Sequence, residues 1–287
     1  LTNNLETSIA NLKAKTDEFK GRLGSAVAAS TKLMQPFREK RYEALREFVG
    51  KNYSDDGASD KVPVNYLAMA TVIYMRQLAA AAPRVLCSTY NPQFKPGAAT
   101  MEVALNDIIE EIDLGESLLI SLVDAIFGIG CMKVGLRSVQ TLDLDGHSYD
   151  VGSPFAEPVD LDDLVIDMTG RRLNECAFMG NRYRVSLDYV RKSEIFARKV
   201  RKTVQASDLN LYNAGGDERA ETLTQGTGYA EGSEFRDLVE LYDIWIPEEN
   251  LVCTFQADSD AAEGDSFFGE PLRVVEWNGP ANGPYHL

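Results

Sequence analysis

Apolar residues recur at intervals of three and four along several stretches of this chain, the spacing that places them on one face of an α-helix. The clearest stretch runs from Leu5 to Val27. Its repeat also fits a coiled coil with a partner chain, but we favour a helix that packs on its own domain. Pro36 is expected to separate this helix from a second one, in which Phe37 faces inward while Arg38 and Arg41 face outward.

Two further helices follow from the same spacing. Asn65 can cap a third helix that ends at about Leu78, because its side chain can accept a hydrogen bond from the first turn. The buried side of that helix is predicted to carry Tyr66, Met69, Ile73 and Tyr74. A long helical stretch over residues 101–127, divided near Gly115, is the fourth.

The second half of the chain alternates apolar and polar residues, which favours strands. Strands are predicted over residues 84–90, 131–137, 177–185, 238–246, 251–255 and 272–277, with a tight hairpin around residues 145–146. Residues 186–204 are predicted to form a helix, and the glycine-rich residues 213–233 and residues 258–266 to form surface loops. Since helices and hairpins are segregated, we expect an α+β fold with a mainly helical region over 1–130 and a β-rich region over 131–287.

Charge narrows the classes of function. The chain has 44 acidic against 29 basic residues and a net charge of −15. A protein that wraps DNA tightly would be basic, because lysine and arginine supply most of the affinity for phosphate. An acidic surface instead suits DNA that passes without being held.

One basic stretch stands out against this acidic background. It could touch DNA or acidic patches of a neighbouring subunit, and we favour the subunit contact or a merely solvated surface. Its residues are Arg191, Lys192, Arg198, Lys199, Arg201 and Lys202.

Catalytic motifs are missing from the sequence. It contains neither GxxxxGK[ST] nor GxGxxG, so we expect no nucleotide cofactor. The four cysteines are widely spaced, which argues against a disulfide framework and a zinc site, and the two histidines, His147 and His286, are poorly placed as catalytic bases. Without such motifs we expect no enzyme. Residues 118–127 are too few to cross a bilayer, so no membrane partner is expected.

One acidic cluster has the residue types of a metal site. Its carboxylates lie close enough in sequence to coordinate Mg²⁺ or Ca²⁺, although we favour a solvated acidic face and assign no metal. The candidates are Asp160, Asp162, Asp163 and Asp167.

The order of motifs resembles the portal proteins of tailed bacteriophages, the head-to-tail connectors of podovirus-like and prophage types. The resemblance begins with Arg38, Arg41 and Tyr42 and the helix opening at 64–66. It continues through segments 83–85, 124–130, 132–134, 158–167, 239–247, 277–280 and 283–285. It covers nearly the whole chain and corresponds to the wing of a portal, so the stem, clip and crown are expected to lie outside this sequence.

The resemblance implies a structural subunit of the virion, assembled in the host cytoplasm into a ring of commonly twelve copies at one capsid vertex. Such a ring contacts the major capsid protein, passes double-stranded DNA during packaging and ejection, and docks terminase and head–tail adaptor proteins. Two alternatives remain open: another virion protein, such as a tail adaptor or internal protein, and a metal-dependent nuclease or hydrolase built on residues 160–167.

Overall fold

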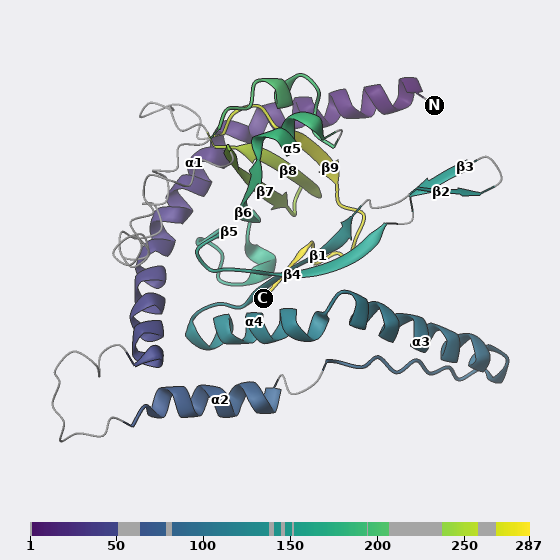
Figure 1. Ribbon diagram of the computed structural model, residues 1–287. Helices are drawn as coiled ribbons and strands as arrows, with labels where there is room; N and C mark the ends of the chain where they lie inside the picture. The colour runs from purple at the N-terminus through teal and green to yellow at the C-terminus, as the bar shows by residue number, and fades with distance from the viewer. Residues whose placement is uncertain are drawn as a thin grey trace. The chain divides into compact units, whose positions relative to one another are not determined.

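A computed structural model describes residues 2–50, 64–78, 82–137, 141–144, 147–150, 152–193, 195–206, 237–257 and 268–287, with no side-chain description for residues 2–19, 141–144, 147–150 and 174. Helices and antiparallel sheets are both present, so the fold is α+β as predicted (Figure 1). The loops predicted at 213–233 and 258–266 lie outside the described residues. Two compact units divide the chain: the first comprises Leu1–Glu39 and Asp162–Gly283, the second Lys40–Leu161 and Pro284–Leu287. They interleave in the sequence, unlike the two consecutive regions predicted.

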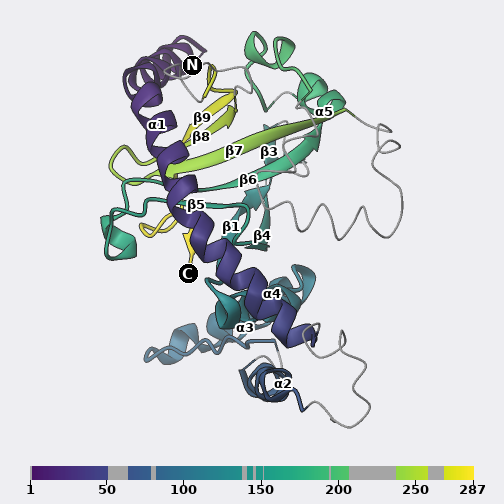
Figure 2. The same cartoon turned by 90° about the vertical axis from the view of Figure 1, so that its left-hand side faces the viewer.

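Helix α1 (Thr2–Val49) is continuous, so the prediction that Pro36 separates two helices was wrong (Figure 2). The buried stripe explains why. Leu23, Val27, Ser30, Met34, Arg38 and Arg41 are all buried and follow one another at intervals of three and four residues straight past Pro36. Packing along this stripe outweighs the hydrogen bond that a proline removes from a helix. Gly50, with φ 81°, ends the helix in the left-handed conformation that glycine adopts most readily.

The first unit is built on a five-stranded antiparallel sheet with the order β5-β6-β7-β8-β9. Its strands are β5 (Leu164–Ile166), β6 (Met179–Ser186), β7 (Leu238–Ile246), β8 (Leu251–Gln256) and β9 (Arg273–Glu276). The predicted hairpin between residues 238–246 and 251–255 is confirmed, with Ile246 paired to Leu251. Both faces of the sheet are buried. Leu23 and Val27 of α1 pack against Ile244 on one face.

The other face is covered by short helical segments that replace a predicted longer helix. Residues 186–204 were predicted to form one helix, but α5 (Leu187–Lys192) ends at Ser193, and only the turn η4 (Val200–Lys202) follows. The predicted cap is confirmed, since Ser186 Oγ accepts the Tyr189 N–H at 3.3 Å. Ser193 explains the early end, because its hydroxyl accepts the Ile195 N–H and its extended backbone replaces the next helical turn.

Among its described residues, the second unit contains a three-stranded antiparallel sheet with the order β10-β1-β4, a separate hairpin, the helices α2, α3 and α4, and the end of α1. The bounds are α2 (Tyr66–Leu78), η2 (Pro92–Phe94), α3 (Lys95–Glu111), α4 (Leu114–Phe127), β1 (Cys131–Arg137), β2 (Thr141–Leu144), β3 (His147–Asp150), β4 (Ser153–Val159) and β10 (Tyr285–His286). The hairpin around 145–146 is confirmed by the pairing of Leu144 with His147. In the first unit, the turn η3 (Leu173–Glu175) precedes β6.

Residues 84–90 form no strand, contrary to prediction. This extended segment is held by the side chains of α3 instead of a neighbouring strand. Asn106 accepts the Val85 N–H at 3.1 Å and donates to the Val85 carbonyl at 3.0 Å, while Glu102 accepts the Cys87 N–H at 3.1 Å. The alternation of Val85 and Cys87 with exposed neighbours therefore comes from a helix lying along one side of the segment.

Helix α2 starts as predicted, but its predicted buried face is exposed. Asn65 caps the helix by accepting the Ala68 N–H at 2.9 Å, and it also donates to the Phe48 carbonyl at the end of α1. Thr71 is the residue that is buried, whereas Tyr66 is 75% exposed and Met69, Ile73 and Tyr74 are each more than half exposed. The spacing identified an apolar face correctly, but nothing in the described part of the chain covers that face.

Candidate functional site

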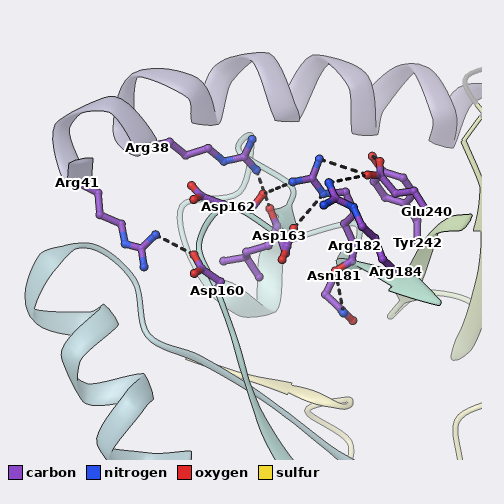
Figure 3. Close-up of polar contacts among 11 residues, drawn as sticks. Arg38, Arg41, Asp160, Asp162, Asp163, Asn181, Arg182, Arg184, Glu240 and Tyr242 are labelled. Carbon is purple, nitrogen blue, oxygen red and sulfur yellow. Dashed lines mark hydrogen bonds and ion pairs between the residues drawn. The ribbon is translucent and has the colours of Figure 1, made fainter. Parts of the chain in front are cut away.

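Asp160, Asp162 and Asp163 lie beside largely buried arginines, and ion pairs join Asp160 to Arg41 and Asp163 to Arg182 (Figure 3). Sequence spacing predicted the acids, but it placed Arg38 and Arg41 outward on their helix. The structure buries both arginines and leaves Phe37 54% exposed, so that prediction was wrong. These guanidiniums can occupy the inward face because fixed carboxylates and carbonyls accept hydrogen bonds from their Nη groups.

In the second unit, Arg41 binds two carboxylates. Its Nη2 lies 2.6 Å from Asp124 Oδ1 on α4, and its Nη1 lies 2.8 Å from Asp160 Oδ1 after β4. Burial disfavours the charge on Arg41, but the two carboxylates outweigh it and raise the pKa of the guanidinium. Arg41 therefore stays charged and fixes one end of the acidic segment to two helices.

In the first unit, Arg182 of β6 gathers three acceptors. Its Nε lies 3.0 Å from Asp163 Oδ1, its Nη2 donates to the Asp162 carbonyl at 3.3 Å, and its Nη1 lies 3.8 Å from Glu240. Burial lowers the pKa of Arg182, but Glu240 and Asp163 together raise it above the ordinary value. The arginine thus ties the acidic segment to the sheet.

Glu240 is the most deeply buried acid of this network, with 4% of its surface exposed. It lies opposite Arg184 in the β6–β7 pairing and accepts from Arg184 at 3.4 Å. Tyr242 donates its hydroxyl to Glu240 at 3.0 Å, and burial together with that carboxylate raises the pKa of Tyr242. The buried charge of Glu240 is therefore matched by two arginines and one phenol.

Helix α1 closes the open side of β5. The Arg182 N–H donates to the Asp163 carbonyl, and the Asp167 N–H donates to the Phe178 carbonyl. Because such bonds alternate along an antiparallel strand, the carbonyls of Leu164 and Ile166 point away from β6. Arg38 donates to the Leu164 carbonyl at 3.2 Å, and the Ser30 hydroxyl donates to the Ile166 carbonyl. Burial lowers the pKa of Arg38, and Asp162 opposes that effect.

Asp167, the last of the predicted metal candidates, accepts hydrogen bonds from its own loop. Thr169 donates its N–H at 2.9 Å and its hydroxyl at 2.7 Å, and Ala177 donates its N–H at 3.0 Å. Burial opposes the charge, but these donors outweigh it and lower the pKa of Asp167. The candidates therefore have separate partners, and across the described ranges no three His, Cys, Asp or Glu residues are grouped to hold a metal ion.

The basic candidates do not lie on one helix, because the helix predicted over residues 186–204 is interrupted after Lys192. Lys192 forms an exposed pair with Asp188 at 3.7 Å, and Arg191 donates to the Val204 carbonyl at 3.3 Å. Lys199 and Lys202 are exposed. Only Arg198 and Arg201 line a common groove, together with Arg273 of β9, which sequence reasoning did not identify.

Sequence reasoning also missed Arg182, Arg184 and Glu240. A signal was present for Glu240, because it is one of two acids in the otherwise apolar strand β7. Cys131 is fully buried, and burial raises the pKa of its thiol to about 12, which leaves it protonated and unreactive.

In the part of the chain that the structure describes, no helix combines the length and the apolar character needed to span a bilayer. The sequence matches no protein-family model, and no curated protein is significantly similar to it.

Proposed function

We propose that this chain is a structural subunit of a tailed-bacteriophage portal ring. The ring would stand at one capsid vertex, pass double-stranded DNA during packaging and ejection, and dock terminase and tail adaptors. The order of sequence motifs from Arg38 to Tyr285 supports the family, and the ring of about twelve copies follows from that resemblance.

One observation carries the proposal: the second unit exposes much of its apolar surface. Monomeric proteins scatter exposed apolar residues singly, whereas contiguous ones indicate contact with another protein. On α2 and the residues that flank it, the exposed set is Val64, Tyr66, Met69, Val72, Ile73, Tyr74 and Leu78. On the extended segment and α3 it is Leu86, Tyr90, Phe94, Met101 and Val103.

The interior of the second unit is correspondingly small. Its described buried apolar residues are Cys131, Ala156, Val159, Leu161 and Tyr285, which lie on or beside its three-stranded sheet. Helices α2 and α3 contribute no large apolar side chain to that core. Burial against neighbouring copies would supply the stabilisation that these helices do not obtain from their own chain.

The acidic segment supports a structural role over the metal-dependent alternative. Asp160, Asp163 and Asp167 accept from arginines and from loop donors, and a metal ion would have to displace those donors. Ion pairs from the largely buried arginines Arg41 and Arg182 to Asp160 and Asp163 hold one arrangement of the chain, which suits a scaffold.

Mass photometry of the purified chain across a dilution series tests the proposal. A portal subunit is expected to give a discrete particle of many copies that dissociates as it is diluted. A chain that remains monomeric at every concentration contradicts the proposal. A discrete oligomer of a few copies, far from about twelve, favours a different virion component.

A further inference from the structure

The two edges of the five-stranded sheet differ. At β5, the outward carbonyls are taken by Ser30 and Arg38 of α1. At the opposite edge, β9 pairs only with β8 among the described strands. The Trp277 N–H donates to the Asn250 carbonyl on the β8 side, so by alternation the N–H groups of Val274 and Glu276 point away from the sheet. An uncovered edge of this kind can accept another strand.

A groove of about 670 Å³ lies beside this edge. Its apolar lining comes from Phe196 and Leu272, which are buried, and from Ile195 and Val275, which are 50% and 36% exposed. The Ala197 N–H donates to the Leu272 carbonyl at 2.8 Å, which fixes the 195–198 segment against the start of β9. The groove therefore combines an apolar lining with main-chain groups of β9 that pair with no strand of the described residues.

Three arginines line the same groove. Arg198 and Arg201 come from the segment after α5, and Arg273 comes from β9. Arg201 donates to the Ser193 carbonyl, which anchors it beside the groove. Among the ion pairs of the described residues, none neutralises these three arginines. In a chain with a net charge of −15, this is a local concentration of positive charge.

We propose that this groove binds an extended acidic peptide of a partner protein, which adds as a strand to the free edge of β9. The main-chain groups of Val274 and Glu276 would pair with the peptide backbone, and every second side chain of the peptide would face the groove. Carboxylates at alternate positions would meet Arg198, Arg201 and Arg273. This proposal does not rest on the portal proposal, because the residues that support the portal proposal do not line the groove.

Charge and shape favour a peptide over nucleic acid. DNA binding would need a broad basic surface, whereas the acid excess of this chain opposes a polyanion at long range. Three arginines at an apolar groove match a short ligand with few carboxylates. The edge of β9 offers main-chain donors and acceptors at the spacing of a strand, which a phosphate backbone cannot use.

Fluorescence anisotropy with labelled synthetic peptides tests the inference. The probes are a short peptide in which glutamate alternates with valine, the same peptide with glutamine in place of glutamate, and the first peptide N-methylated at every second amide. A labelled DNA duplex is the fourth probe. Only the acidic, unmethylated peptide is expected to bind, with affinity at least about tenfold above the other two peptides.

Matched variants locate the site. The double substitution Arg198→Gln and Arg273→Gln is expected to weaken binding by about tenfold or more, while the exposed pair Arg171→Gln and Arg172→Gln leaves it within about twofold. Glu276→Pro removes an N–H that points away from β8 and leaves the hydrogen bonds between β8 and β9 in place. The Glu276→Pro variant should therefore bind the acidic peptide more weakly than the Glu276→Gln variant. Circular dichroism verifies that each variant is folded.

Three results overturn the inference. They are equal binding of the acidic and glutamine peptides, equal losses in the two arginine pairs, and binding of the duplex without binding of any peptide. A fourth result, equal affinities of the two Glu276 variants, would overturn strand addition even if the arginines proved essential.

Discussion

Arg41 and Asp124 join α1 to α4 through a bond that spans 83 residues of sequence, with Nη2 2.6 Å from Oδ1. Their side chains are only 9% and 12% exposed. Removing one partner from such a pair leaves the other charge buried and poorly compensated, whereas replacing both with apolar residues can be nearly neutral.

A double-mutant cycle measures this coupling. We expect Arg41→Leu alone to lower the free energy of unfolding by about 3 to 5 kcal/mol, because it leaves the buried Asp124 carboxylate without its arginine partner. Adding Asp124→Leu should restore about 2 kcal/mol or more. Urea unfolding followed by circular dichroism gives all four values.

The exposed pair Arg137 and Glu157, whose side chains are 55% and 50% exposed, is the control for that cycle. Its coupling, measured with Arg137→Gln and Glu157→Gln, should stay below about 1 kcal/mol. Equal coupling in the two cycles would show that the Arg41 pair is not buried as described.

Asp167 makes stability depend on pH. Its pKa is lowered in the folded chain, so at acidic pH the unfolded chain binds a proton before the folded chain does. The stabilisation is therefore complete above the ordinary aspartate pKa and is lost as the pH falls through the lowered value. Asp167→Asn should cost about 1 to 3 kcal/mol at pH 7, and its difference from wild type should shrink below about pH 4.

Thermal unfolding from neutral to acidic pH checks this expectation, with the exposed Asp107→Asn as the control. The control should follow the wild-type curve at every pH. A constant difference between wild type and Asp167→Asn at every pH would exclude the carboxylate as its source.

The cysteines report on the core. Of the four thiols, Cys131, Cys176 and Cys253 are buried and Cys87 is partly exposed. Burial raises the pKa of Cys131 to about 12 and also raises that of Cys176. A thiol-specific chromogenic reagent should therefore label Cys87 quickly and the other three only on unfolding, and Cys87→Ser should abolish the fast phase. Rapid labelling of Cys131 or Cys253 in the native protein would contradict the described core.

The apolar face of α2 should carry assembly. Met69→Glu with Ile73→Glu keeps good helix formers but places charge on the exposed face, so it should shift the mass-photometry distribution toward monomers. Leu33→Glu introduces charge at a leucine of α1 that is 56% exposed in the first unit, and should leave the distribution unchanged. If the α2 variant assembles like wild type, that face is not an interface.

Local patterns predicted the α+β class, the strands β6 to β9 and the capping of α2 by Asn65, because these depend on near neighbours in sequence. They failed where distant partners decide the outcome. Arg38 and Arg41 are buried because carbonyls and carboxylates more than 80 residues away receive them. Met69 and Ile73 form an apolar face of the predicted spacing, but spacing cannot say whether the covering surface belongs to the same chain.

The site was predictable only in part for the same reason. Asp160 to Asp167 were recognisable as a cluster of acids, but sequence alone could not pair Asp163 with Arg182 or Asp160 with Arg41. Arg198 and Arg201 were recognised as basic, but they were expected to lie on one helix over residues 186–204, which Ser193 interrupts. Arg273 joins them only through the order of the strands.

Electron microscopy of the purified chain tests the central claim most directly. The portal account predicts class averages of a closed ring with a rotational order near twelve, an open central channel and subunit contacts that include α2. Particles without rotational symmetry, or compact monomers at high protein concentration, would contradict it.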